Sequence, residues 1–195
     1  MSKILILSNG HGEDLSGSIL AEKLIEMGHE VDALPIVGKG TIYKKNKIKV
    51  VCRTKEFSTG GLGYNTLKGR LSDIFNGQIF YFLKQLFLVF LIRKKYQYFL
   101  VVGDIIPLFF AWLSRKKYFV YLVAYSSHYE GKLKLPWPSK IFLNSNKLQN
   151  LYTRDLLTSK DLTKQLNRKA LFYGNPFMDI FFKREKHFKH SVFNI

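Results

Sequence analysis

Residues that could move a proton or bind a hydroxylated ligand gather in short turns of this sequence. The carboxylate of Asp104 and the imidazole of His11 could each accept a proton from an attacking hydroxyl group, so we expect both to be catalytic. The candidates for substrate binding are small or polar residues, namely Asn9, Gly10, Gly12, Glu13, Asp14, Gly60, Gly61 and His128. Carboxylates in the first turn would repel a pyrophosphate, so this turn favours a ligand whose hydroxyl groups donate hydrogen bonds.

Four of these residues also have a purely structural interpretation. Asp104 precedes an expected helix and could serve only as its N-cap. His11 lies between two glycines and could hydrogen-bond its own backbone. Glu13 and Asp14 stand where a helix is expected to begin, beside the positive end of its dipole. The residues alone leave both interpretations open.

The elements on either side of the first turn are a strand and a helix. Residues 4–7 form an apolar run without a polar interruption, which is typical of a strand buried on both faces of a parallel sheet. Leucines and isoleucines then recur at helical spacing from Leu15 until Gly28 ends the pattern. In an open α/β sheet, such a turn lies at the carboxyl ends of the strands, where ligands bind.

Strand and helix patterns alternate along the rest of the chain. Strands are expected at 31–34, 48–52, 99–104, 118–124, 151–153 and 170–173, and helices at 67–95, at 107–114 and after a capping sequence at 158–161. Two prolines predict a loop at 133–139. The alternation predicts an α/β fold with a doubly wound parallel sheet, a single Rossmann-like domain. Its turns at 9–14, 59–64, 103–106 and 125–130 should line one cleft.

The charge of the chain predicts an anionic partner. Lysine and arginine number 31 against 14 acidic residues, which gives a formal net charge of +17. No zinc-ligand spacing, RNA-binding signature or helix-turn-helix pattern accompanies this charge, so we expect no nucleic acid partner and no metal. The first turn lacks the third glycine of a dinucleotide fingerprint, so we expect no cofactor and disfavour an NAD- or nucleotide-binding enzyme.

The segment 75–92 is apolar on nearly all sides and ends in Arg93-Lys94-Lys95. Such a helix is either buried against the sheet, which is the more common outcome, or partly inserted in an anionic membrane surface. Lys84 and Gln85 interrupt it, and it is too short to cross a bilayer. Together with the lone Cys52 and the lack of a signal peptide, this predicts a cytoplasmic protein, peripheral at the inner face of a membrane.

Six short motifs occur in an order that resembles a known family. They are Ser8-Asn9-Gly10-His11-Gly12-Glu13-Asp14, Ala33-Leu34-Pro35-Ile36-Val37-Gly38, Ser58-Thr59-Gly60-Gly61, Val102-Gly103-Asp104-Ile105-Ile106-Pro107, Thr153-Arg154-Asp155 and Gly174-Asn175-Pro176-Phe177-Met178-Asp179. Together they resemble the amino-terminal half of the lipid-A-disaccharide-synthase-related proteins of cyanobacterial type, over roughly residues 3–179. That family is similar to lipid-A-disaccharide synthase, a GT-B glycosyltransferase.

The resemblance implies a fold, a reaction and partners. A GT-B enzyme has two Rossmann-like domains, of which the first holds a lipid-linked sugar acceptor and the second a UDP-sugar that donates a hexosyl group. Asp104 resembles an acidic residue implicated in catalysis, although the surrounding Asp-x-Pro-Asp-Phe pattern is incomplete here. Asp14 with Gly17 resembles the Gly-Asp-x-x-Gly end of the first loop of the synthase, with Glu13 in place of its glycine.

The length of the chain departs from the family pattern. We expect an acceptor-side domain at 1–179, followed by a linker remnant and basic tail at 180–195. The UDP-sugar domain would then be missing, or supplied by a separate partner chain. Because a GT-B reaction needs donor and acceptor held together, we expect the chain alone to be inactive. The alternative is a non-catalytic protein that binds lipid or sugar at a membrane surface.

Overall fold

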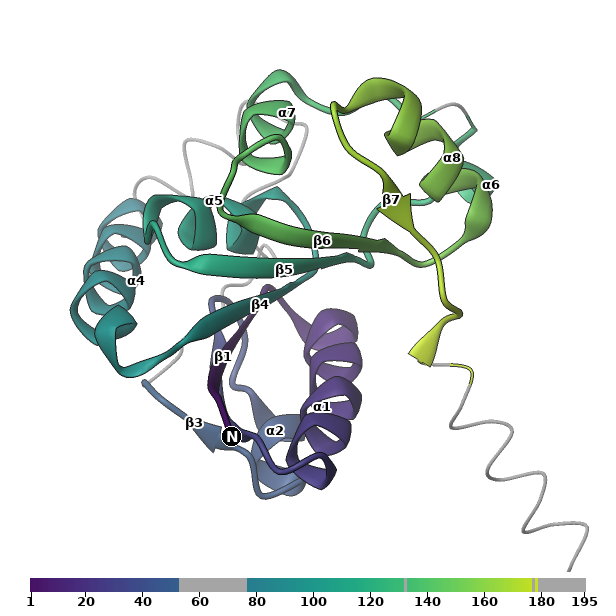
Figure 1. The fold of residues 1–195 in the computed structure, drawn as a ribbon. Coiled ribbons are helices and arrows are strands. Elements are labelled where there is room, and N and C mark those ends of the chain that lie inside the picture. The colour runs from purple at the N-terminus through teal and green to yellow at the C-terminus, as the bar shows by residue number, and fades with distance from the viewer. Residues whose placement is uncertain (53–76, 132, 177, 179–195) are drawn as a thin grey trace, which may run out of the picture.

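The computed structural model describes residues 1–52, 77–131, 133–176 and 178 (Figure 1). Within these residues, seven parallel strands form one sheet in the order β3-β2-β1-β4-β5-β6-β7. The strands are β1 (Lys3–Ser8), β2 (Glu30–Pro35), β3 (Lys49–Val50), β4 (Tyr98–Val102), β5 (Lys117–Leu122), β6 (Leu148–Thr153) and β7 (Ala170–Leu171). The prediction of a doubly wound parallel sheet is confirmed.

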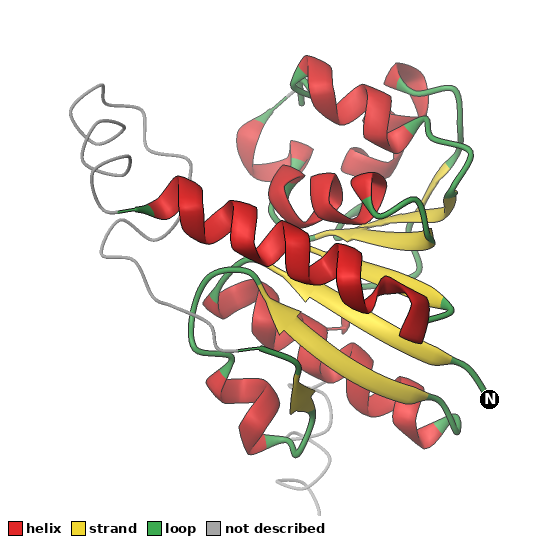
Figure 2. Ribbon diagram, turned by 90° about the vertical axis from the view of Figure 1, so that its left-hand side faces the viewer, coloured by secondary structure: helices red, strands yellow, loops and turns green. Residues whose placement is uncertain are grey.

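Helices pack on both faces of the sheet, each over its own hydrophobic cluster (Figures 1 and 2). On one face lie α1 (His11–Glu26) and α2 (Thr41–Lys45), and on the other lie α4 (Gln78–Ile92), α5 (Ile105–Leu113), α7 (Trp137–Leu143) and α8 (Leu156–Gln165). The 3-10 turn η1 (Arg93–Lys95) follows α4, and the short α6 (Ser127–Glu130) contacts α8. Because parallel crossovers are right-handed, the helices change face where the strand order reverses, between β1 and β4.

Two local predictions from the sequence are wrong. The helix α7 begins inside the expected loop at 133–139, because Pro136 acts as its N-cap and Pro138 sits in its first turn, where proline is tolerated. The helix α8 begins at Leu156 instead of after the capping sequence at 158–161. Its N-cap is Asp155, whose carboxylate accepts a hydrogen bond from the Thr158 backbone N–H at 2.7 Å. The expected turn at 59–64 and the start of the helix at 67–95 lie outside the described residues.

The long helix α4 is buried on one side only (Figure 2). Val89 and Gln85 face the core and are almost fully buried, whereas Phe80 is 78% exposed and Phe87 is 64% exposed. The helix is therefore buried against the sheet along one side, as the sequence favoured, and the apolar residues on its other side are exposed. Among the described residues, no helix has both the length and the apolar character needed to cross a membrane.

Candidate functional site

The reversal of strand order brings the first turn and the turn after β4 together. Ser8, the last residue of β1, lies opposite Val102, the last residue of β4. The residues that follow, Asn9 and Asp104, therefore meet at the carboxyl edge of the sheet. The Nδ2 of Asn9 donates a hydrogen bond to Oδ2 of Asp104 at 3.1 Å. This edge is where open α/β sheets bind ligands.

Asp104 has two partners and a shifted pKa. Its Oδ1 accepts a hydrogen bond from the Ile106 backbone N–H at 2.9 Å, so it is the N-cap of α5, as its structural interpretation predicted. Burial raises the pKa of Asp104, although the hydrogen bonds from Ile106 and Asn9 act in the opposite direction. A carboxylate with a raised pKa is a stronger base than an exposed one, so capping α5 does not exclude a catalytic role.

Glu13 completes a group of two carboxyls held by one asparagine. Its Oε2 accepts a hydrogen bond from the Asn9 backbone N–H at 2.7 Å. Burial, and then the negative charge of Asp104, raise the pKa of Glu13 to about 8. Near neutral pH the carboxyl group of Glu13 is therefore mostly protonated. We call Asn9, Glu13 and Asp104 the edge cluster.

Gly103 provides the space that Glu13 occupies. Its φ of 140° is one that residues with a side chain rarely adopt, and a Cβ at this position would overlap the carboxyl group of Glu13. Glycine here allows the Glu13 side chain to lie against the backbone between β4 and Asp104. The glycine between Val102 and Asp104 in this motif is therefore required by the position of the Glu13 side chain.

We expect Gly103→Ala to destabilise the protein by roughly 2–4 kcal/mol, because it adds both an overlap and a strained φ. Urea unfolding monitored by circular dichroism measures this effect. The matched control is Gly12→Ala on α1, where nothing lies within 4 Å of the added Cβ and alanine favours the helix. Equal stability of the two variants would show that Glu13 is not packed against residue 103.

A second layer of hydrogen bonds supports the first turn from beneath. The hydroxyl of Ser8 donates to Oδ1 of Asp14 at 2.6 Å, and the hydroxyl of Tyr43 donates to Oγ of Ser8 at 3.0 Å. Tyr43 packs directly over Gly17, where any Cβ would overlap its hydroxyl group. Asp14 is only 3% exposed, so it has little surface for a ligand and acts mainly in this support.

The other predicted site residues are not part of the edge cluster. Gly10 is the N-cap of α1, with a φ of 137°, and Gly12 is exposed in the first turn of that helix. His11 begins α1, but its side chain is not among the described ones. His128 is exposed in α6, where its ring packs against Tyr129 with centroids 5.1 Å apart. Gly60 and Gly61 lie outside the described residues.

The supporting residues Ser8 and Tyr43 were not among the site residues predicted from the sequence. Ser8 ends an apolar strand and could have been noticed as a polar residue at a buried position, but Tyr43 is distant in sequence and carries no local signal. Within the described part of the chain, no group of three or more histidine, cysteine, aspartate or glutamate side chains could hold a metal ion.

The sheet order and its helices define the class of fold to which this chain belongs, a single Rossmann-like α/β domain. Solved structures share it at low sequence identity. *Anabaena* Alr3699/HepE in complex with UDP-glucose aligns with a TM-score of 0.57 and 13% identity, over 90% of this chain and 44% of that chain. A glycosyltransferase from *Rickettsia africae* ESF-5 aligns with a TM-score of 0.58 and 14% identity, over 89% of this chain and 42% of that chain.

MurG from *Acinetobacter baumannii* aligns with a TM-score of 0.50 and 12% identity, over 80% of this chain and 42% of that chain. The chain therefore spans less than half the length of each of these structures. No protein-family model and no curated protein matches the sequence. At this level of identity, the likeness establishes the fold.

Proposed function

We propose that this chain is the acceptor-binding half of a lipid-A-disaccharide-synthase-like glycosyltransferase, which moves a hexosyl group from a UDP-sugar to a lipid-linked acceptor. The observation that carries the proposal is the edge cluster: Asn9, Glu13 and Asp104 converge at the carboxyl edge of a GT-B-like sheet. The ordered motifs of the sequence supply the resemblance to the synthase-related family.

The proposed reaction needs a base beside the acceptor hydroxyl. The hydroxyl oxygen attacks the anomeric carbon of the donor sugar, and the bond from that carbon to the UDP oxygen breaks. UDP leaves with the electron pair, and the hydroxyl proton passes to Asp104 or to His11. Asn9 keeps the Asp104 carboxylate in place through its 3.1 Å hydrogen bond. The largely protonated Glu13 adds little negative charge beside Asp104 near neutral pH.

The charges of the edge cluster support an acceptor site over a site for UDP. A carboxylate at Asp104 would repel a diphosphate, whereas sugar hydroxyl groups donate hydrogen bonds to carboxylates. HepE was solved in complex with UDP-glucose, and this chain covers 44% of it. We therefore assign UDP-sugar binding to a second unit outside residues 1–195.

A sugar-transfer assay tests this proposal. Radiolabelled UDP-sugars are incubated with a lipid extract and with the chain, either alone or together with the product of the neighbouring gene as a donor-binding unit. The proposal requires no labelled lipid from the chain alone, since positioning of both substrates supplies much of the rate. Turnover by the chain alone would refute the proposal that a separate unit must bind the UDP-sugar.

The exposed face of α4 supports a peripheral position at the inner surface of a membrane. Phe80, Leu83, Phe87 and Leu91 recur at helical spacing and are each more than half exposed. Lys94 and Lys95 are exposed at the end of this helix, and the guanidinium of Arg93 lies 3.6 Å from the centroid of the Phe90 ring. An apolar face next to basic residues suits the boundary between acyl chains and anionic headgroups.

We expect the chain to float with anionic phosphatidylglycerol vesicles at low salt, and the double variant Phe80→Ser/Phe87→Ser to bind at least about tenfold less. Vesicle flotation measures the bound fraction. The control is Leu156→Ser/Leu157→Ser on α8, which removes two side chains of similar exposure, 52% and 50%, elsewhere on the surface. Equal loss in both double variants would contradict a specific role of α4.

The same helix supports the second candidate function, a non-catalytic protein that binds lipid or sugar at a membrane surface. The two candidates differ in their need for the edge cluster. A transferase half loses activity when Asp104 is changed, whereas a surface-binding protein depends on α4 and keeps its function. Flotation and sugar transfer, measured on the same variants, separate them.

A further inference from the structure

The two faces of the central strands are covered unequally. On β4 and β5, Phe99, Val101, Tyr118 and Val120 point toward α4, α5 and α7 and are fully buried. The alternate residues Leu100 and Phe119 point to the face of α1 and are only partly buried. Helices normally cover both faces of a parallel sheet, whereas the described helices cover the face beside α1 only in part.

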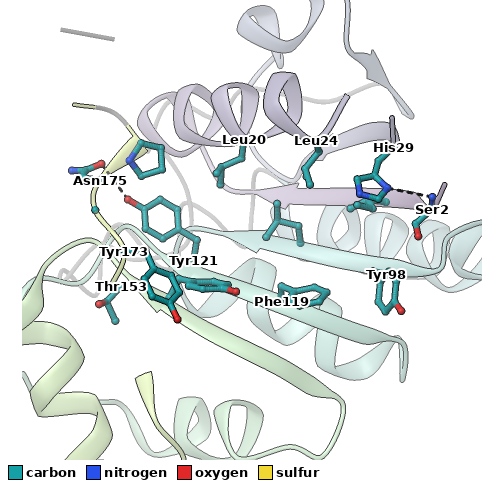
Figure 3. Close-up of a pocket in the computed structure, with 15 residues that line it drawn as sticks. Ser2, Leu20, Leu24, His29, Tyr98, Phe119, Tyr121, Thr153, Tyr173 and Asn175 are labelled. Atoms are coloured by element: carbon teal, nitrogen blue, oxygen red, sulfur yellow. Dashed lines mark hydrogen bonds between the residues drawn. The ribbon is translucent and has the colours of Figure 1, made fainter. Parts of the chain in front are cut away.

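This uncovered face forms a groove of about 580 Å³ (Figure 3). Leu20 and Leu24 of α1 form one wall, and Tyr98, Phe119 and Tyr121 form the floor. The lining is mostly apolar, with polar atoms at its ends. At one end the Ser2 backbone N–H donates to Nδ1 of His29 at 3.3 Å, and at the other the Tyr121 hydroxyl donates to Oδ1 of Asn175 at 3.2 Å. The groove is therefore distinct from the edge cluster.

The chain leaves the sheet at the rim of the groove. Tyr173, Asn175 and Pro176 line it, and Tyr173 remains 81% exposed. Met178, the last described residue, is 46% exposed, so apolar surface continues toward the carboxyl terminus. The segment that follows, 179–195, contains seven apolar residues that suit such a surface, Ile180, Phe181, Phe182, Phe188, Val192, Phe193 and Ile195.

We propose that the groove is the docking surface for the chain's own segment 179–195. The segment begins where the groove ends, so little chain entropy opposes this contact compared with that of a separate molecule. Its length is sufficient, because even as a helix it would extend about 25 Å. The groove crosses from β1 to β6, three strand spacings or about 15 Å. Docking would cover the aromatic floor that no described helix covers.

A thiol-labelling experiment tests the proposal. In a Cys52→Ser background, Leu100→Cys places a reporter in the groove, and its reaction with a maleimide is compared between the whole chain and a chain ending at Met178. A segment that is docked nine-tenths of the time slows labelling about tenfold in the whole chain. Lys160→Cys, at an exposed position on α8, is the control and should react equally in both lengths. Tyr152→Cys repeats the test if Leu100→Cys does not fold.

A synthetic peptide of residues 179–195 should slow labelling of the shortened chain saturably. The same peptide with Phe181, Phe182, Phe188 and Phe193 changed to Ser should not. Equal labelling rates of the two lengths would overturn the proposal. Labelling that slows with protein concentration in both lengths would also overturn it, and would assign the groove to a second copy of the chain.

Discussion

Glu13→Gln is expected to stabilise the protein by roughly 2–4 kcal/mol at pH 8 and to flatten the fall in stability between about pH 4.5 and 8. The pKa of Glu13 is raised in the folded state to about 8, from its ordinary value of 4.5. Between these values the folded state binds a proton that the unfolded state has released. Stability therefore falls as the pH rises through this window. Glutamine cannot ionise, so Glu13→Gln removes this pH-dependent loss of stability. Its amide oxygen can still accept the hydrogen bond from the Asn9 backbone N–H.

Urea unfolding at intervals from pH 5 to 9 measures the difference between wild type and Glu13→Gln. The control is Glu22→Gln, which changes an exposed glutamate on the same helix and should leave the pH dependence unchanged. Asp104, whose pKa is also raised, contributes with the same sign and leaves a residual slope. Parallel stability curves for wild type and Glu13→Gln would show that Glu13 is not the desolvated carboxyl described here.

The second large effect is on catalysis. In an enzyme reconstituted with a donor-binding unit, Asp104→Asn is expected to lower kcat by a factor of about 10²–10⁴, because it removes the proposed general base. Asparagine is as good an N-cap as aspartate, so α5 should keep its N-terminal hydrogen bond from the Ile106 backbone N–H. Single-turnover transfer at saturating acceptor measures the chemical step without the binding step.

Asp155→Asn is the matched control for this variant. Asp155 caps α8 through the Thr158 backbone N–H, just as Asp104 caps α5 through that of Ile106. The control therefore makes the same chemical change at another helix start and should leave kcat unchanged. If Asp104→Asn kept full activity, Asp104 would be an N-cap only, and His11 would remain as the candidate base.

The order of elements and the edge of the sheet that holds the candidate site could be predicted from sequence. Apolar runs such as residues 4–7 and 99–102 identify the buried strands, and the crossover rule then brings their carboxyl ends together. Asp104 could be expected near the first turn for this reason. Its 3.1 Å hydrogen bond with Asn9 depends on strand register, which no local pattern specifies.

Tertiary contacts explain what the sequence did not reveal. Proline suggested a loop near residue 136, yet Pro136 is the N-cap of α7, whose Phe142 is buried in the core. The Thr158 side chain resembled an N-cap, but it lies within α8 and accepts a hydrogen bond from the Ser127 backbone N–H at 2.8 Å. The periodicity of α4 indicated an apolar helix, and only the structure separates its packed side from its exposed side.

The central claim is that the edge cluster binds a hydroxylated acceptor and not the nucleotide donor. The most direct measurement follows the side-chain amide signal of Asn9 by nitrogen-15 NMR, assigned with an Asn9→Asp variant, during separate titrations with UDP-glucose and with an alkyl glucoside below its micelle-forming concentration. We expect a saturable shift with the glucoside, lost in Asp104→Asn, and no shift with UDP-glucose. A saturable shift with UDP-glucose, or no shift with the glucoside, would contradict it.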